Sequence, residues 1–237
     1  MKQEKVNLRE MELQGESFFN RHLRSLQLVY QIVEEQRLQL ETIMKTPGNH
    51  EKDMLEVIRR IVNEIYSGCE IINELLIAIF RNDDRYRGNA LKNGFNKNFK
   101  VVYDAKVNAS IAPPIFQDNF IWDFFLNAEQ WYVVLHDIRT QETHYEVGKI
   151  INDGTILKYV NKNRNGTSKS IYTNPDEDIN VTLIDFLNLI NNFLETENRI
   201  AELICQRILA PIMSSAGRKL QDYEKKSVKS KNRWVCK

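Results

Sequence analysis

An apolar residue recurs every three or four positions throughout residues 51–80, and this constrains the fold more than any other feature of the chain. The set is Met54, Ile58, Ile61, Ile65, Cys69, Ile72, Leu76 and Ile79. Such spacing places the apolar side chains on one face of a continuous helix, which must be buried against other elements. Residues 16–44 carry the same pattern, and Pro47-Gly48-Asn49 between the two segments is a turn signal. Two long helices joined by so short a loop are expected to lie antiparallel.

Two more long helices are expected further along. The first is indicated by Phe116, Phe120, Phe124, Ala128, Trp131, Leu135 and Ile138, an aromatic-rich stripe typical of a core. We expect it to end at Gly148. The second is indicated over residues 180–209 by Leu183, Leu187, Ile190, Leu194, Ala201, Ile204 and Ile208. Asn180 or Asp178 is its expected N-cap.

Shorter elements lie between these helices. Residues 89–103 favour a short helix inside a connector, and Pro113-Pro114 prevents a helix immediately before Ile115. Residues 149–160 are typical of two strands around an Asn-Asp-Gly turn, and residues 169–172 follow a second turn. The sequence therefore predicts a small β-meander inserted at about residues 147–173.

The predicted fold class is all-α, a bundle of long antiparallel helices with that β-meander as an insertion. We expect one domain over residues 16–217, preceded by an extension at 1–15. Residues 218–237 are basic and polar, and we expect this tail to be partly disordered.

Composition excludes several classes of protein. Lysine and arginine number 33 against 32 acidic residues, so the net charge of +1 creates no overall attraction for nucleic acid or membrane, and any basic surface must be local. The three cysteines, Cys69, Cys205 and Cys236, have no metal-ligand spacing and fit a reducing compartment. No secretory signal or run of about 18 apolar residues is present, so a cytoplasmic protein is expected. No cofactor or metal ion is expected, because glycine-rich phosphate loops and zinc-hydrolase motifs are missing from the sequence.

One pair of residues suggests chemistry. Arg139 and His144 form an R-x4-H arrangement at the end of the third long helix. An arginine fork can hold a phosphate group, and an imidazole with a pKa of about 6.5 can move a proton near neutral pH. Together they can cleave RNA without a metal ion, leaving a 2′,3′-cyclic phosphate and a 5′-hydroxyl.

Helix geometry restricts how this pair can act. Five residues along an ideal helix separate two side chains by about 140° around the axis and about 7.5 Å along it. Either the helix is distorted at its end, or a second copy of the chain completes the site across a dimer interface. The second arrangement predicts a homodimer with Thr143 and Tyr145 near the phosphate.

The helical hairpin and the later helix ending in Arg139 and His144 resemble the HEPN superfamily, whose motif is R-x4-6-H. The Thr143-His144-Tyr145 context is similar to that of bacterial members. The resemblance implies a homodimer with the motif at the dimer cleft and metal-independent RNA cleavage by a toxin or antiviral RNase, with an antitoxin or operon partner. Many active members carry Asn, Asp or His after the arginine, whereas Thr140 stands here; it can form hydrogen bonds but supplies neither carboxylate nor amide.

Other interpretations remain open. Arg139 and His144 can simply interact favourably with the helix dipole, and the chain can be a non-catalytic module that binds RNA, a nucleotide or a partner protein. His136 either lines the same cleft or is a half-buried structural residue. Glu142 either orients the imidazole or pairs with Arg139 three residues earlier.

Basic residues of the β-meander are candidate RNA contacts. Their side chains can guide RNA toward the cleft by contacting phosphates, or they can form an ordinary solvated hairpin. The candidates are Lys158, Lys162, Arg164 and Lys169.

Overall fold

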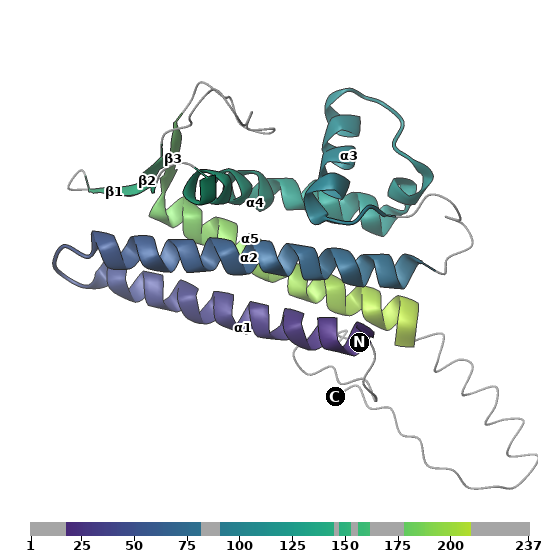
Figure 1. Cartoon of the computed structure of the whole chain (residues 1–237), viewed down its shortest axis with the longest axis horizontal. Coiled ribbons are helices and arrows are strands. Elements are labelled where there is room, and N and C mark those ends of the chain that lie inside the picture. Colours follow the sequence, from purple (N-terminus) through teal and green to yellow (C-terminus); the bar gives the residue numbers. More distant parts are fainter. Residues whose placement is uncertain (1–17, 82–90, 145–146, 153–155, 162–177, 210–237) are drawn as a thin grey trace, which may run out of the picture.

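The predicted helical hairpin is present in the computed structural model, which describes residues 18–81, 91–144, 147–152, 156–161 and 178–209. Helices α1 (Phe18–Lys45) and α2 (Glu51–Phe80) lie side by side and antiparallel (Figure 1). The chain reverses at Gly48, whose φ of +127° is strained for any residue with a side chain. The predicted apolar stripe of α2 packs inward, with Ile58, Ile65 and Ile72 buried.

A second layer of helices covers this hairpin. It consists of α3 (Phe95–Val107), a 3-10 turn η3 (Pro114–Gln117), α4 (Asn119–His144) and α5 (Leu183–Ile204), which continues into a π-helical turn η4 (Cys205–Leu209). In Figure 1, α5 runs behind α2 and crosses the hairpin, while α4 lies above it. The predicted aromatic stripe lies in the core, since Phe116 of η3 and Phe124 and Trp131 of α4 are buried.

The start of α4 differs from the expected one by a few residues. Pro114 opens the 3-10 turn, and the α-helix begins only at Asn119, after Asp118. The Asp118 carboxylate accepts hydrogen bonds from the backbone N–H groups of Phe120 and Ile121 (3.0 and 3.5 Å), which caps the helix. Arg207 of η4 also donates to this carboxylate at 2.9 Å.

Three antiparallel strands form one small sheet in the order β1-β2-β3. The strands are β1 (Lys149–Asn152), β2 (Leu157–Asn161) and β3 (Ile179–Thr182). The first two match the predicted hairpin, with Ile150 opposite Tyr159. The predicted third strand at 169–172 lies outside the described residues, as do the extension at 1–15 and the tail at 218–237.

The predicted N-cap of the last long helix is wrong. Asn180 lies within β3 and Asp178 precedes that strand, because Ile179 and Val181 continue the alternating pattern of a strand. Helix α5 begins at Leu183, and the hydroxyl of Thr182 accepts the backbone N–H of Asp185 at 3.0 Å. The cap is therefore Thr182.

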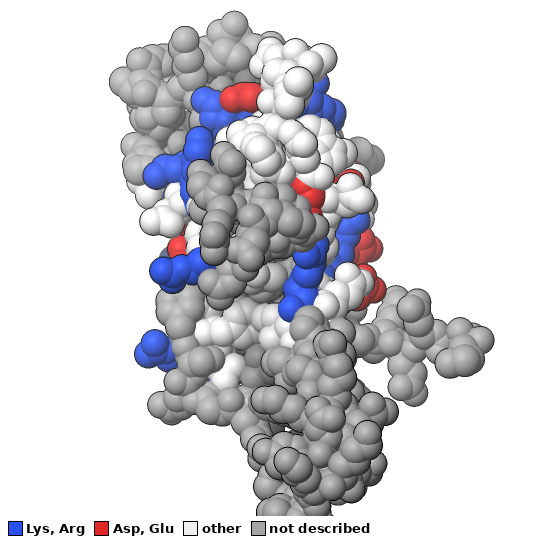
Figure 2. All heavy atoms as spheres, turned by 90° about the vertical axis from the view of Figure 1, so that its right-hand side faces the viewer, with Lys and Arg blue, Asp and Glu red and all other residues white. Residues whose placement is uncertain are grey.

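The fold is thus mainly helical with a small antiparallel sheet. Within the described ranges, no helix combines the length and apolar character needed to cross a membrane. Figure 2 shows the end of the molecule that carries α3, where Lys and Arg side chains are scattered among acidic and uncharged residues. Among the residues coloured on that face, basic side chains form no single block.

Candidate functional site

Two polar helix faces meet where α2 passes α4. Arg59, Asn63 and Tyr66 recur at intervals of four and three residues on α2, so they share one face. On α4, Arg139, Glu142 and Thr143 share a face in the same way. The contacts between these two sets define the candidate site.

Arg139 is held by an aromatic ring of α2. Its guanidinium carbon lies 3.7 Å from the centroid of the Tyr66 ring, a cation–π contact. Burial raises the pKa of Tyr66, and the positive charge of Arg139 opposes that rise. Within the described part of the chain, no carboxylate lies within ion-pair distance of Arg139. Stacking occupies a face of the guanidinium, so the donors around its edge can still bind an anion.

Glu142 pairs with Arg59 across the two helices. The Arg59 Nε donates to Glu142 Oε2 at 2.6 Å, and the Glu142 side chain is only 8% exposed. The alternative pairing with Arg139 is not the one observed among the described residues. Glu142 therefore ties the end of α4 to α2.

The other oxygen of Glu142 holds the sheet. Oε1 accepts the Tyr159 hydroxyl at 2.7 Å and the backbone N–H of Gly148 at 2.8 Å, and Asn161 Nδ2 donates to the same hydroxyl at 3.1 Å. Burial and the Glu142 carboxylate raise the pKa of Tyr159 well above its ordinary value. Gly148 lies against the ring, since a Cβ there would stand 2.4 Å from Tyr159 carbons. It does not end α4 as predicted, because the described helix ends at His144.

A pocket of about 300 Å³ opens between these helices. It is lined by Arg59, Val62, Asn63, Arg139, Glu142 and Thr143. Two guanidiniums and one carboxylate give the lining a net charge of +1. With an amide and a hydroxyl as neutral donors, this arrangement can bind a small anion.

The structure brings some predicted site residues together and separates others. Arg139 and Thr143 line the pocket, and His144 follows as the last residue of α4, although its side chain lies outside the described part. Tyr145 also lies outside it. Thr140 is half-buried and does not line the pocket.

His136 is placed away from this pocket. Its side chain is 15% exposed, its ring centroid lies 5.5 Å from that of Tyr132, and its Nδ1 lies 3.5 Å from a carboxylate oxygen of Asp137. These contacts match the half-buried structural interpretation.

Only one candidate RNA contact of the β-meander falls on a described residue. Lys158 is half-buried on β2, opposite Ile151 and Thr182 of the neighbouring strands, and it does not line the pocket. Lys162, Arg164 and Lys169 lie outside the described residues.

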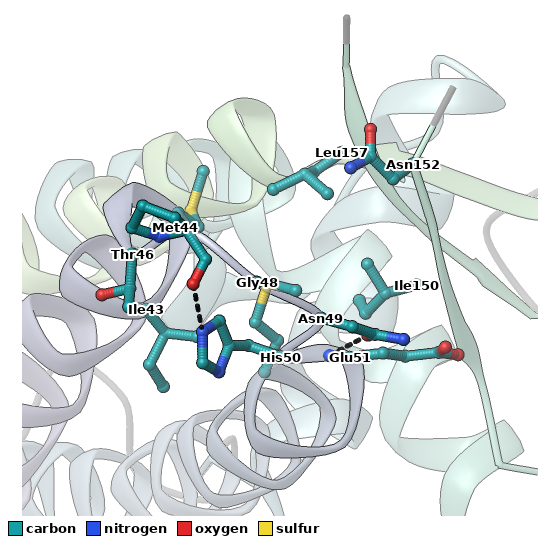
Figure 3. A pocket seen from close by; sticks show the side chains of 12 residues that line it. Ile43, Met44, Thr46, Gly48, Asn49, His50, Glu51, Ile150, Asn152 and Leu157 are labelled. Carbon is teal, nitrogen blue, oxygen red and sulfur yellow. Dashed lines mark hydrogen bonds between the residues drawn. The ribbon is translucent and has the colours of Figure 1, made fainter. Parts of the chain in front are cut away.

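A larger pocket of about 590 Å³ lies at the α1–α2 turn, beside β1 and β2 (Figure 3). Its apolar lining includes Met54, Ile150 and Leu157, and Glu51 and His50 are its titratable groups. The His50 ring lies 3.2 Å from the Pro47 carbonyl oxygen. No lysine or arginine is found among its described lining residues, which offer less to a phosphate than those of the smaller pocket do.

Arg59, Asn63 and Tyr66 were missed from sequence alone. A signal was present, because these polar residues recur at helical spacing within a strongly apolar helix. Their partners on α4 are far away in the chain, since Glu142 lies 83 positions after Arg59. Local spacing could therefore identify the face but not what it meets.

Within the described ranges, no group of three or more His, Cys, Asp or Glu side chains could hold a metal ion. Comparisons with protein-family models, with curated proteins and with solved structures find no match.

Proposed function

We propose that the chain is a HEPN-type, metal-independent endoribonuclease in which Arg139 binds the scissile phosphate and His144 transfers the proton. One observation carries the proposal: Arg139 lines a pocket and makes no ion pair among the described residues. Thr143 lines the same pocket, and His144 is the next residue, at the end of α4. An arginine already paired with a carboxylate would be less available to an anion.

The proposed reaction needs no other reagent. The 2′-oxygen of the ribose attacks phosphorus as its proton passes to an imidazole, and the bond from phosphorus to the 5′-oxygen breaks. The leaving oxygen takes up a proton from an imidazolium, so no proton is gained or lost overall, and the products are a 2′,3′-cyclic phosphate and a 5′-hydroxyl. Arg139 stabilises the negative charge that develops on the phosphoryl oxygens.

A homodimer is part of the proposal. Helix α4 is α-helical up to His144, so no distortion of the helix brings Arg139 and His144 onto the same side. The angle of about 140° expected of an ideal helix then favours a site shared by two copies of the chain. A role as a bacterial toxin or antiviral RNase with an antitoxin or operon partner fits such an enzyme.

The test is cleavage of a labelled structured RNA in EDTA by the purified full-length chain. Wild type should leave cyclic-phosphate ends, and Arg139→Ala and His144→Ala should each abolish cleavage while circular dichroism stays unchanged. RNase activity that survives both substitutions would refute the proposal. RNA binding without cleavage by wild type would instead assign the chain to the non-catalytic binding modules.

A further inference from the structure

We infer that Arg59 of α2 is a second phosphate-binding residue, so that the pocket between α2 and α4 holds one phosphate group between two guanidiniums. The inference rests on the proposed function only in taking RNA as the source of that phosphate. Arg59 lies outside the R-x4-H motif and 80 positions before Arg139, as the difference between 139 and 59 gives.

The ion pair with Glu142 leaves much of the Arg59 fork open. The hydrogen bond to Glu142 uses Nε, and within the described part of the chain neither terminal nitrogen of Arg59 makes a hydrogen bond. The Arg59 side chain is 40% exposed, and it lines the pocket. An arginine fixed through one nitrogen is pre-organised, so less side-chain freedom is lost when the remaining donors bind a phosphate.

The carboxylate of Glu142 does not close the pocket to anions. Its oxygens already accept three hydrogen bonds, from the Arg59 Nε, the Tyr159 hydroxyl and the Gly148 N–H. These donors stabilise the negative charge and hold it toward Arg59 and the sheet. We therefore assign Glu142 as a positioning residue for Arg59.

The second guanidinium, that of Arg139, is held by stacking on an aromatic ring and not by an ion pair with a described residue. Tyr66 stacks on Arg139, which fixes the plane of the fork and leaves its edge to ligands. Asn63 and Thr143 add an amide and a hydroxyl from the two helices. The net charge of +1 matches the single negative charge of a phosphodiester. A volume of about 300 Å³ lies at the lower end of small-ligand sites, enough for a phosphate group with part of its nucleotide.

The decisive measurement is RNA affinity, with cleavage removed from the experiment. We would use full-length His144→Ala as the reference protein, so that the RNA is not consumed, and add Arg59→Gln to it. The control adds Arg60→Gln instead, because Arg60 is the next residue, is 56% exposed, pairs with Glu56 and does not line the pocket. The probes are one short single-stranded RNA with a 5′-phosphate and the same RNA with a 5′-hydroxyl.

Arg59→Gln should weaken binding by about tenfold and lower the slope of log affinity against log salt by about 0.7, whereas Arg60→Gln should change neither. A loss seen with both RNAs assigns the pocket to an internal phosphodiester. A loss confined to the phosphorylated RNA assigns it to a terminal phosphate. Arg59→Lys keeps a charge beside Glu142 but not the fork; it should keep the salt slope and still bind more weakly than the reference.

The inference is overturned if Arg59→Gln binds as Arg60→Gln does with the same salt slope, or if the reference protein binds neither RNA. Should Arg59→Gln not fold, Arg59→Lys decides, and affinity equal to that of the reference would overturn the inference. Cleavage by wild type is scored separately. A protein that cleaves but is insensitive to Arg59 would refute this subsite alone, and one that binds through Arg59 without cleaving would refute the RNase alone.

Discussion

The Tyr159 hydroxyl donates a hydrogen bond to Glu142 Oε1 at 2.7 Å, and this contact joins the central strand of the sheet to the last turn of α4. The sheet is therefore bound to the same carboxylate that orients Arg59. The stability of the β-meander and the geometry of the candidate site are linked through one side chain.

Replacing Tyr159 by phenylalanine should destabilise the fold by about 1–3 kcal/mol, because the buried Glu142 carboxylate loses a donor and the Asn161 amide loses one acceptor. Urea unfolding followed by circular dichroism measures the change. A free energy of unfolding equal to that of wild type would mean that water replaces the hydroxyl without loss.

The stability of wild type should fall as the pH rises above about 10. Tyr159 has a pKa raised above the ordinary tyrosine value of 10.0, so in that range the unfolded chain releases a proton that the folded chain retains. Its contribution is complete below pH 10 and is lost as the pH rises toward the folded-state pKa. Tyr66, whose pKa is also raised, acts in the same direction.

Urea midpoints between pH 8 and 11 test this dependence. Wild type should lose stability more steeply than Tyr159→Phe, which retains only the part due to Tyr66 and other groups. Equal slopes for the two proteins would exclude Tyr159 as a cause.

Gly148→Ala should cost about 1–3 kcal/mol, because the new methyl group would lie 2.4 Å from carbons of the buried Tyr159 ring and must displace it. The double variant with Tyr159→Ala supplies the control. If overlap with the ring is the cause, the alanine at position 148 should cost much less in that background. An equal cost in both backgrounds would point to the backbone instead.

The aromatic ring of Tyr66 should contribute more to RNA affinity than its hydroxyl group does. In the His144→Ala protein, Tyr66→Leu removes the surface on which Arg139 stacks and should weaken RNA binding by roughly two- to tenfold, whereas Tyr66→Phe keeps the ring and should leave the affinity unchanged. Fluorescence polarisation with a labelled RNA measures both. Equal affinities for the leucine and phenylalanine variants would show that stacking does not position Arg139.

Thr182→Ala should destabilise the protein by about 1 kcal/mol, since the Asp185 backbone N–H loses its capping oxygen. Asn180→Ala is the matched control, because Asn180 is exposed on β3 and caps no helix. Thermal unfolding should separate the two variants, and the reverse order would restore Asn180 as the cap.

Local pattern predicted the long helices well. Helix α2 begins and ends where its apolar period does, and α1 differs from the expected range by one or two residues at each end. The start of α5 could not be predicted from the apolar period. Ile179 and Val181 alternate as in a strand, but the stretch is too short to identify one from the sequence alone, and pairing with β2 holds it extended.

The candidate site could be predicted only in the part that lies within one helix. Arg139 and Thr143 are four residues apart, so the sequence itself places them on one face. Arg59 and Tyr66 reach Arg139 and Glu142 only after α2 and α4 pack, and no local spacing encodes that meeting. Burial of the apolar residues of α2 and α4 in a common core brings these polar side chains together.

The Asp118 carboxylate, which caps α4 and accepts a hydrogen bond from Arg207, fastens the two ends of one long span of chain. Between these residues lie α4, all three strands and α5. The ion pair between Asp118 and Arg207 joins the two ends of this span, and Arg139 and Glu142 lie between them. Breaking this contact would remove one link between the start of α4 and the end of α5, while the cation–π contact of Arg207 with Phe80 and the buried Phe116 would still hold both ends to the core.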